Sequence, residues 1–161
     1  MRRHLFFIAL FLTGQLIHAQ QNSTVDCTAG PVSTTFCYDT GLDNSHTFTS
    51  NDGTPLNLTV DVGQVETNWD ELVIRDSDGT ELYNGYGNGG DISGLTFQSS
   101  GDTIEFEVVE DGSISCVSSG YTPITFTVSC ATCINPQVNY EVVSDCLNAP
   151  QFFVDVNVID L

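Results

Sequence analysis

The sequence predicts an all-β protein whose larger, N-terminal part is a two-sheet antiparallel sandwich. Three observations predict it. Apolar and polar residues alternate with a period of two in several short runs, turn residues separate these runs, and helix signals are nearly absent. The chain is also acidic and carries six cysteines, an even number that indicates disulfides in an oxidising compartment. Short strands at such spacing in a chain of this kind are typical of a β-sandwich.

The N-terminal segment, residues 1–19, has the layout of a secretory signal peptide. Arg2 and Arg3 give a positive start, residues 5–12 are an unbroken apolar run, and Ala19 is a small residue at a cleavage position. A membrane span needs about 20 apolar residues, so an anchor is disfavoured. We therefore expect a secreted, extracellular or cell-surface protein that begins at Gln20 and has no membrane insertion.

Four runs carry the clearest strand pattern. They span residues 56–62, 104–108, 124–128 and 153–158, and every second residue in each is apolar. Such a strand buries one face and leaves the other wet. Between two further apolar runs, Asp78-Gly79 predicts a hairpin with a type I′ turn.

The strand pattern also suggests where the domains end. Residues 20–131 have the size of one sandwich domain. The pattern then restarts and runs to Leu161, over a segment too short to bury a core of its own. Its strands either complete the first domain or begin a second. We favour residues 132–161 as the start of a second immunoglobulin-like or fibronectin-like β domain, which we expect to be truncated because its strand pattern stops midway.

All six cysteines lie after the leader and indicate three disulfides. They are Cys27, Cys37, Cys116, Cys130, Cys133 and Cys146. Of the many possible pairings we favour neighbours in sequence: Cys27–Cys37, Cys116–Cys130 and Cys133–Cys146. The Cys130-Ala131-Thr132-Cys133 motif leaves open a redox pair or half of a zinc site. A redox motif of this type begins a helix, whereas this one follows a strand-like run.

The charge of the chain is strongly one-sided. It has 21 Asp and Glu residues and no lysine, and Arg75 is the one basic side chain after the leader. Nucleic acid and anionic membrane both require Lys/Arg patches, so we exclude them as partners. Carboxylates are the ligands that calcium prefers. The expected partner is cationic.

Residues for enzyme chemistry are scarce, and we predict that the protein is not an enzyme. His46, the one histidine after the leader, falls in an alternating run, and we place it on the polar face. No nucleophile elbow is present. A carboxylate-pair glycosidase is compatible with the composition, but the chain leaves little room for a substrate cleft. Residues 85–90 match G-x-G-x-x-G, but no helix follows as a dinucleotide site requires, so we interpret them as a flexible loop in which Tyr83 and Tyr86 could contact a partner.

Two segments resemble motifs of CUB domains. Residues 65–79 resemble the aromatic-Asp-x-Leu-x-Ile-x-Asp-Gly strand, and residues 106–113, with Gly120-Tyr121 after them, resemble the late F-x-S-D-x-S…G-F motif. The resemblance spans roughly Cys27 to Cys130 and is similar to CUB-like modules at the N-termini of large bacterial surface proteins. It implies a two-sheet jelly-roll-like sandwich that acts as a binding or adhesion module.

The resemblance also implies a calcium site. In calcium-binding CUB domains a Glu, the Asp after the aromatic residue and the Asp of the late motif converge on one ion. Asp70 matches the second of these and Asp111 the third, and Glu66 is the candidate for the first. Glu66 lies closer to Asp70 than is typical, and the cysteine that usually precedes the aromatic-Asp pair is absent. The alternative is that all three are solvated turn carboxylates.

The function that follows is a secreted module with calcium-ordered loops. These loops would present carboxylates to a protein or carbohydrate partner that carries basic or polyhydroxylated groups. A non-binding spacer or cap domain of a large surface protein is one alternative. An accessory domain of a secreted enzyme is the other.

Overall fold

The computed structural model describes residues 21–133 and the strands at 137–144 and 152–159; the predicted signal peptide and Cys146 lie outside these residues. The strands are β1 (Gln21–Val25), β2 (Val32–Phe36), β3 (Ser45–Ser50), β4 (Leu56–Val62), β5 (Glu71–Arg75), β6 (Glu81–Gly85), β7 (Thr96–Gln98), β8 (Thr103–Val109), β9 (Ile124–Cys130), β10 (Gln137–Ser144) and β11 (Phe152–Ile159), and α1 (Cys116–Ser119) is a single helical turn. Within this part of the chain, no helix has the length and apolar character that crossing a membrane requires.

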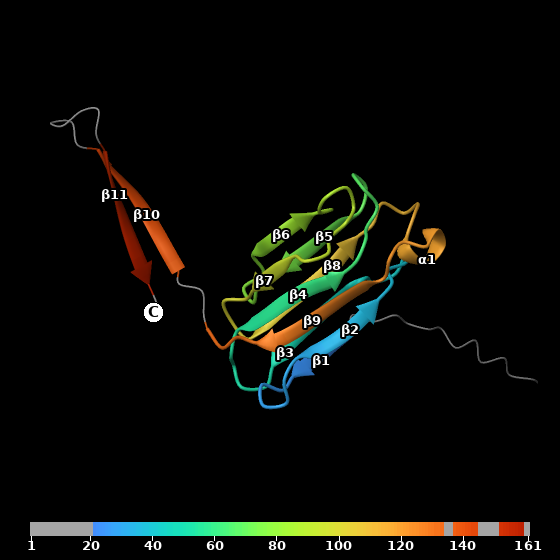
Figure 1. The fold of residues 1–161 in the computed structure, drawn as a ribbon, viewed down its shortest axis with the longest axis horizontal. Coiled ribbons are helices and arrows are strands. Elements are labelled where there is room, and N and C mark those ends of the chain that lie inside the picture. Colours follow the sequence, from blue (N-terminus) through green and yellow to red (C-terminus); the bar gives the residue numbers. More distant parts are fainter. Residues whose placement is uncertain (1–20, 134–136, 145–151, 160–161) are drawn as a thin grey trace, which may run out of the picture.

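Two sheets pack face to face in the larger part of the structure (Figure 1). One has five strands in the order β1-β3-β8-β5-β6, and the other has four in the order β2-β9-β4-β7. The predicted all-β sandwich is confirmed. One pair departs from the antiparallel expectation, because β1 runs parallel to β3. β10 and β11 form a separate antiparallel hairpin, and its assignment to a second domain stays a prediction.

The alternating runs became strands because their apolar residues fill the space between the sheets. In β4, Leu56, Leu58 and Val60 are buried, whereas the residues between them are half-buried. Aromatic rings join the two sheets at the centre: the ring of Phe126 in β9 lies 5.4 Å from that of Phe48 and 4.9 Å from that of Phe106. Each such fully buried side chain contributes about 1.5–3 kcal/mol relative to an exposed one.

The predicted hairpin is present, but its turn is not type I′. β5 and β6 pair antiparallel, with a register shift next to the turn. A type I′ turn needs positive φ at both central residues, and Asp78 is not among the described residues with positive φ. Instead Gly79 donates its N–H to the carbonyl of Asp76, 2.9 Å away, so that Gly79 is the last residue of the turn. The extra residue is accommodated by the shifted register.

His46 lies in the core, not on the wet face where we placed it. It is two residues from Phe48 and therefore on the same face of β3; its exposed fraction is 5% and its ring stacks on Phe48 at 4.2 Å. Nε2 lies 2.9 Å from Ser23 Oγ, and burial lowers the pKa of the imidazole. The neutral ring thus serves as a core aromatic residue.

The favoured cysteine pairing is wrong for four of the six cysteines. The structure joins Cys27 to Cys130 and Cys37 to Cys116, with Cα–Cα distances of 5.4 and 5.3 Å. Cys27 and Cys37 lie beyond opposite ends of β2, and an extended strand rises about 3.3 Å per residue, which puts them far outside the ~7 Å limit for a disulfide. Cys116 and Cys130 are kept apart in the same way, because the extended strand β9 lies between them.

Cys133 is exposed and has no disulfide partner among the described residues. Its predicted partner, Cys146, lies outside them. Because Cys130 is bonded to Cys27, the redox and zinc readings of the Cys130–Cys133 motif are wrong. The two disulfides instead fasten the two ends of the sandwich.

Candidate metal site

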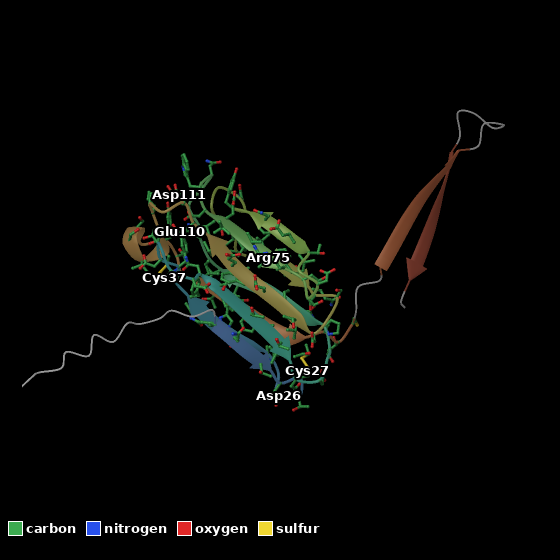
Figure 2. The ribbon with its side chains drawn as sticks, turned by 180° about the vertical axis from the view of Figure 1, so that it is seen from behind. Asp26, Cys27, Cys37, Arg75, Glu110 and Asp111 are labelled. Atoms are coloured by element: carbon green, nitrogen blue, oxygen red, sulfur yellow. A yellow bond between two sulfur atoms is a disulfide. The ribbon has the colours of Figure 1, made fainter. Side chains whose placement is uncertain are left out.

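The three carboxylates predicted to bind calcium lie at one end of the sandwich. Figure 2 shows Asp111 and Glu110 at the end that carries Cys37, opposite the end with Asp26 and Cys27. β8 finishes there and β5 begins there, since Val109 pairs with Glu71. The segment before β5 and the segment after β8 are therefore neighbours, although they are some 40 residues apart in the chain, as the 41-residue separation of Asp70 and Asp111 shows.

Glu66, Asp70 and Asp111 converge. One carboxylate oxygen from each lies within 4.8 Å of the others. Asp70 is completely buried, Glu66 is half-buried and Asp111 is exposed. The short spacing of Glu66 and Asp70 is possible because the chain makes one tight turn: the N–H of Asp70 donates to the carbonyl of Glu66 at 3.1 Å, and Asn68 adopts a left-handed φ of 68°.

Tyr38 holds this cluster together, and sequence reasoning missed it. Its Oη donates to Asp70 Oδ2 at 2.6 Å and accepts the N–H of Glu66 at 3.2 Å. Burial and the neighbouring Asp70 both raise the pKa of Tyr38, so the hydroxyl stays protonated and remains a donor. Its position next to Cys37 was the one hint in the sequence, because the Cys37–Cys116 disulfide fixes the backbone beside it.

The two aspartates are fastened by further hydrogen bonds. The N–H of Asp111 donates to Asp70 Oδ1 at 3.1 Å, which ties the two segments to each other. Asp111 Oδ1 in turn accepts the N–H and the hydroxyl of Ser113, at 3.0 and 2.8 Å. Both aspartates are thus oriented before any ligand arrives.

Glu66 is different, because its Oε2 is buried and has no hydrogen-bond partner among the described atoms. Desolvation, and then the charges of Asp111 and Asp70, raise the pKa of the Glu66 carboxyl. In the part of the chain that the structure describes, Arg75 is the one basic side chain, and it does not relieve these charges. Arg75 lies on the five-stranded sheet (Figure 2). One of its Nη atoms binds Glu105 and Glu107 there, each at 2.6 Å.

A second group of metal-ligand residue types consists of Cys27, Asp52 and Cys130. The two cysteines are bonded to each other, so neither can provide a thiolate. This group is therefore a disulfide beside a turn aspartate, and among the described residues Glu66, Asp70 and Asp111 are the remaining candidate.

Comparisons with known proteins show which solved structures share this fold. No family model matches the chain, and no curated protein matches it. Among solved structures, the extracellular region of zebrafish Gpr126/Adgrg6 matches with a TM-score of 0.50 and 17% identity, over 69% of this chain and 15% of that chain. The MASP-1 CUB2 domain bound to Ca²⁺ matches with a TM-score of 0.49 and 14% identity, over 69% of this chain and 99% of that domain. The fold is a CUB-like β-sandwich.

The third structure is the pre-peptidase C-terminal domain of a Bacillus anthracis collagenase. It has a TM-score of 0.39 and 12% identity, over 69% of this chain and 95% of that domain. At such identities the likeness concerns the fold alone. The predicted CUB-like sandwich is confirmed, and a disulfide-bonded CUB-like fold is typical of extracellular proteins.

Proposed function

We propose that this chain is a secreted, non-catalytic, calcium-stabilised CUB-like module that binds or adheres to a partner through the end of the sandwich that carries Glu66, Asp70 and Asp111. One observation carries the proposal: a carboxylate oxygen of Glu66 is buried without a hydrogen-bond partner, and the Glu66 carboxylate lies within 4.8 Å of those of Asp70 and Asp111. A spacer domain has no need of this arrangement.

The residues present fit a calcium ion. Three like charges within 4.8 Å repel one another, and a buried oxygen without a donor is costly. Calcium takes about six to eight oxygen ligands from carboxylates, carbonyls and water, so it matches this donor set. A bound ion would supply positive charge that offsets the repulsion. No sulfur or imidazole ligand is available in the cluster, which disfavours zinc.

The chain's own residues prepare the site. Tyr38 donates to one oxygen of the Asp70 carboxylate and the N–H of Asp111 donates to the other, and Ser113 orients Asp111. With these contacts in place, Glu66 is the carboxylate that must still acquire a partner. A ligand shared by all three would join the segment before β5 to the segment after β8, and so would order the loops at this end.

The same end of the sandwich has features of a contact surface. The large apolar side chains that are exposed in the described residues all belong to its loops, its strand ends and α1: Leu42, Val62, Trp69, Val109 and Val117. Trp69 is 63% exposed and directly precedes Asp70. Exposed apolar groups rimmed by polar ones are typical of protein contact sites, and exposed tryptophans often dominate binding energy. The surrounding carboxylates favour a partner with basic groups.

A basic probe tests the binding role. We expect an oligolysine peptide to bind the immobilised protein more tightly in calcium than in chelator, and Trp69→Ala to weaken the calcium-dependent part. Non-specific attraction to an acidic protein behaves in the opposite way, because a bound cation lowers the net negative charge.

Surface plasmon resonance at fixed ionic strength measures this difference. Binding that falls when calcium is added, or that is equal in parent and Trp69→Ala, would contradict the proposed binding end. It would favour the spacer or accessory-domain alternatives.

A further inference from the structure

The glycine-rich stretch at residues 85–90 is a hydrogen-bonded loop and not the flexible one that we predicted. The N–H of Gly90 donates to the carbonyl of Tyr86 at 3.0 Å, and the N–H of Asn88 donates to the carbonyl of Asp91 at 2.9 Å. Tyr83 Oη accepts the N–H of Gly87 at 2.9 Å, and the rings of Tyr83 and Tyr86 pack against the core. These rings support the loop and are half-buried, and their part in a contact surface stays a prediction.

One residue of this loop, Gly90, lies directly against the segment that carries Glu66. Gly90 is buried, and its carbonyl accepts the N–H of Val65 at 2.9 Å. A Cβ on Gly90 would lie 2.5 Å from the carbonyl oxygen of Val65 and 2.8 Å from Thr67 Oγ1, whereas real Cβ contacts stay above 3.0 Å. The two residues that it would strike are the two neighbours of Glu66.

Glu66 is the member of the cluster that depends most on its backbone. Hydrogen bonds to their carboxylates orient Asp70 and Asp111, but Glu66 Oε2 has no such partner. Its direction therefore follows from where residues 65–67 run. Metal–ligand distances hold to within about 0.2 Å, so a shift of this backbone by a few tenths of an ångström matters.

We propose that Gly90 is a positioning residue for the cation site: because it lacks a side chain, residues 65–67 can pack against the 85–91 loop in the register that points Glu66 at Asp70 and Asp111. This inference rests on the proposed calcium site. It gives the glycine-rich motif a role that does not involve a nucleotide. Gly90 touches no ligand itself and acts through the backbone on either side of Glu66.

The test compares Gly90→Ala with Gly94→Ala in the full chain. Both glycines have positive φ, +91° and +80°, so alanine strains the backbone at both, but nothing lies within 4 Å of the Cβ position of Gly94. Both variants should melt below the parent in chelator. Gly90→Ala should also weaken calcium binding at least about tenfold, as the loss of a supporting contact around a metal site does, while Gly94→Ala retains the parent dissociation constant.

Isothermal titration calorimetry with calcium alone gives these constants. If the parent binds calcium and the two variants bind it equally well, this inference is overturned and the proposed function stands. If the parent binds none, the proposed function fails and this inference fails with it. If Gly90→Ala does not fold, Tyr83→Phe decides, because it removes the hydroxyl that supports the same loop without adding an atom. Weaker calcium binding than the parent supports the positioning role, and unchanged binding overturns it.

Discussion

Replacement of Cys27 and Cys130 together by alanine is expected to lower the free energy of unfolding by about 4–5 kcal/mol. This bond joins residues 103 apart in sequence, so it restricts nearly the whole sandwich in the unfolded state. It also fastens the chain just after β1 to the end of β9. Urea denaturation of the parent and of the double variant, each extrapolated with its own m-value, measures the loss.

Cys133→Ala is the matched control, because this thiol is exposed and unbonded among the described residues. It should change stability by less than about 0.5 kcal/mol, as surface substitutions usually do. Non-reducing peptide mapping should recover the Cys27–Cys130 and Cys37–Cys116 peptides. A double variant as stable as the parent, or a recovered Cys27–Cys37 peptide, would contradict this connectivity.

Glu66→Gln is expected to have two opposite effects. In chelator it should raise the melting temperature, because it removes a charge that is held close to Asp70 and Asp111. In calcium it should lose most of the stabilisation that the parent gains, because a neutral amide is a weaker ligand for a hard cation than a carboxylate. The variant should therefore be more stable than the parent without calcium and less responsive with it.

The pH dependence of metal-free protein follows from the raised pKa of Glu66. The unfolded chain loses this proton near the ordinary value of 4.5, while the folded protein keeps it to higher pH. The contribution of this carboxyl to stability is therefore present below 4.5 and is lost as the pH rises through the raised pKa. Glu66→Gln should remove that loss, whereas Glu71→Gln, an exposed residue at the same end, should not. Equal pH profiles of stability in all three proteins would contradict a raised pKa of Glu66 in the folded state.

The strands were predictable because alternation is a local signal. Residues 56–62 match β4 from end to end, and the other runs differ from their strands by one or two residues. What alternation does not encode is which strands become neighbours, so it gave no sign that β1 would pair parallel to β3. The cysteine pairing failed for the same reason, since proximity in sequence is a poor guide where each cysteine follows or precedes an extended strand.

The site was predictable only in its parts. Glu66 and Asp70 share one tight turn, so their short spacing in the sequence already brings them close together. Asp111 was assigned to the site by resemblance alone. Apart from its position beside Cys37, nothing in the sequence pointed to Tyr38, because its contact with Asp70 joins residues 32 apart through the packing of two sheets. His46 was assigned to the wrong face of its strand. It lies two residues before Phe48 in β3, and residues two apart share a face, so the apolar Phe48 should have placed His46 in the core.

A calorimetric titration of the parent with calcium, set beside thermal melts in calcium and in chelator, tests the central claim most directly. We predict about one ion bound per chain, and a gain in stability of about 2.7 kcal/mol at a hundredfold excess of calcium over its dissociation constant. Magnesium, which demands a tighter octahedral shell, should give a smaller gain. Absence of binding heat together with identical melts in calcium and chelator would contradict a calcium site formed by Glu66, Asp70 and Asp111.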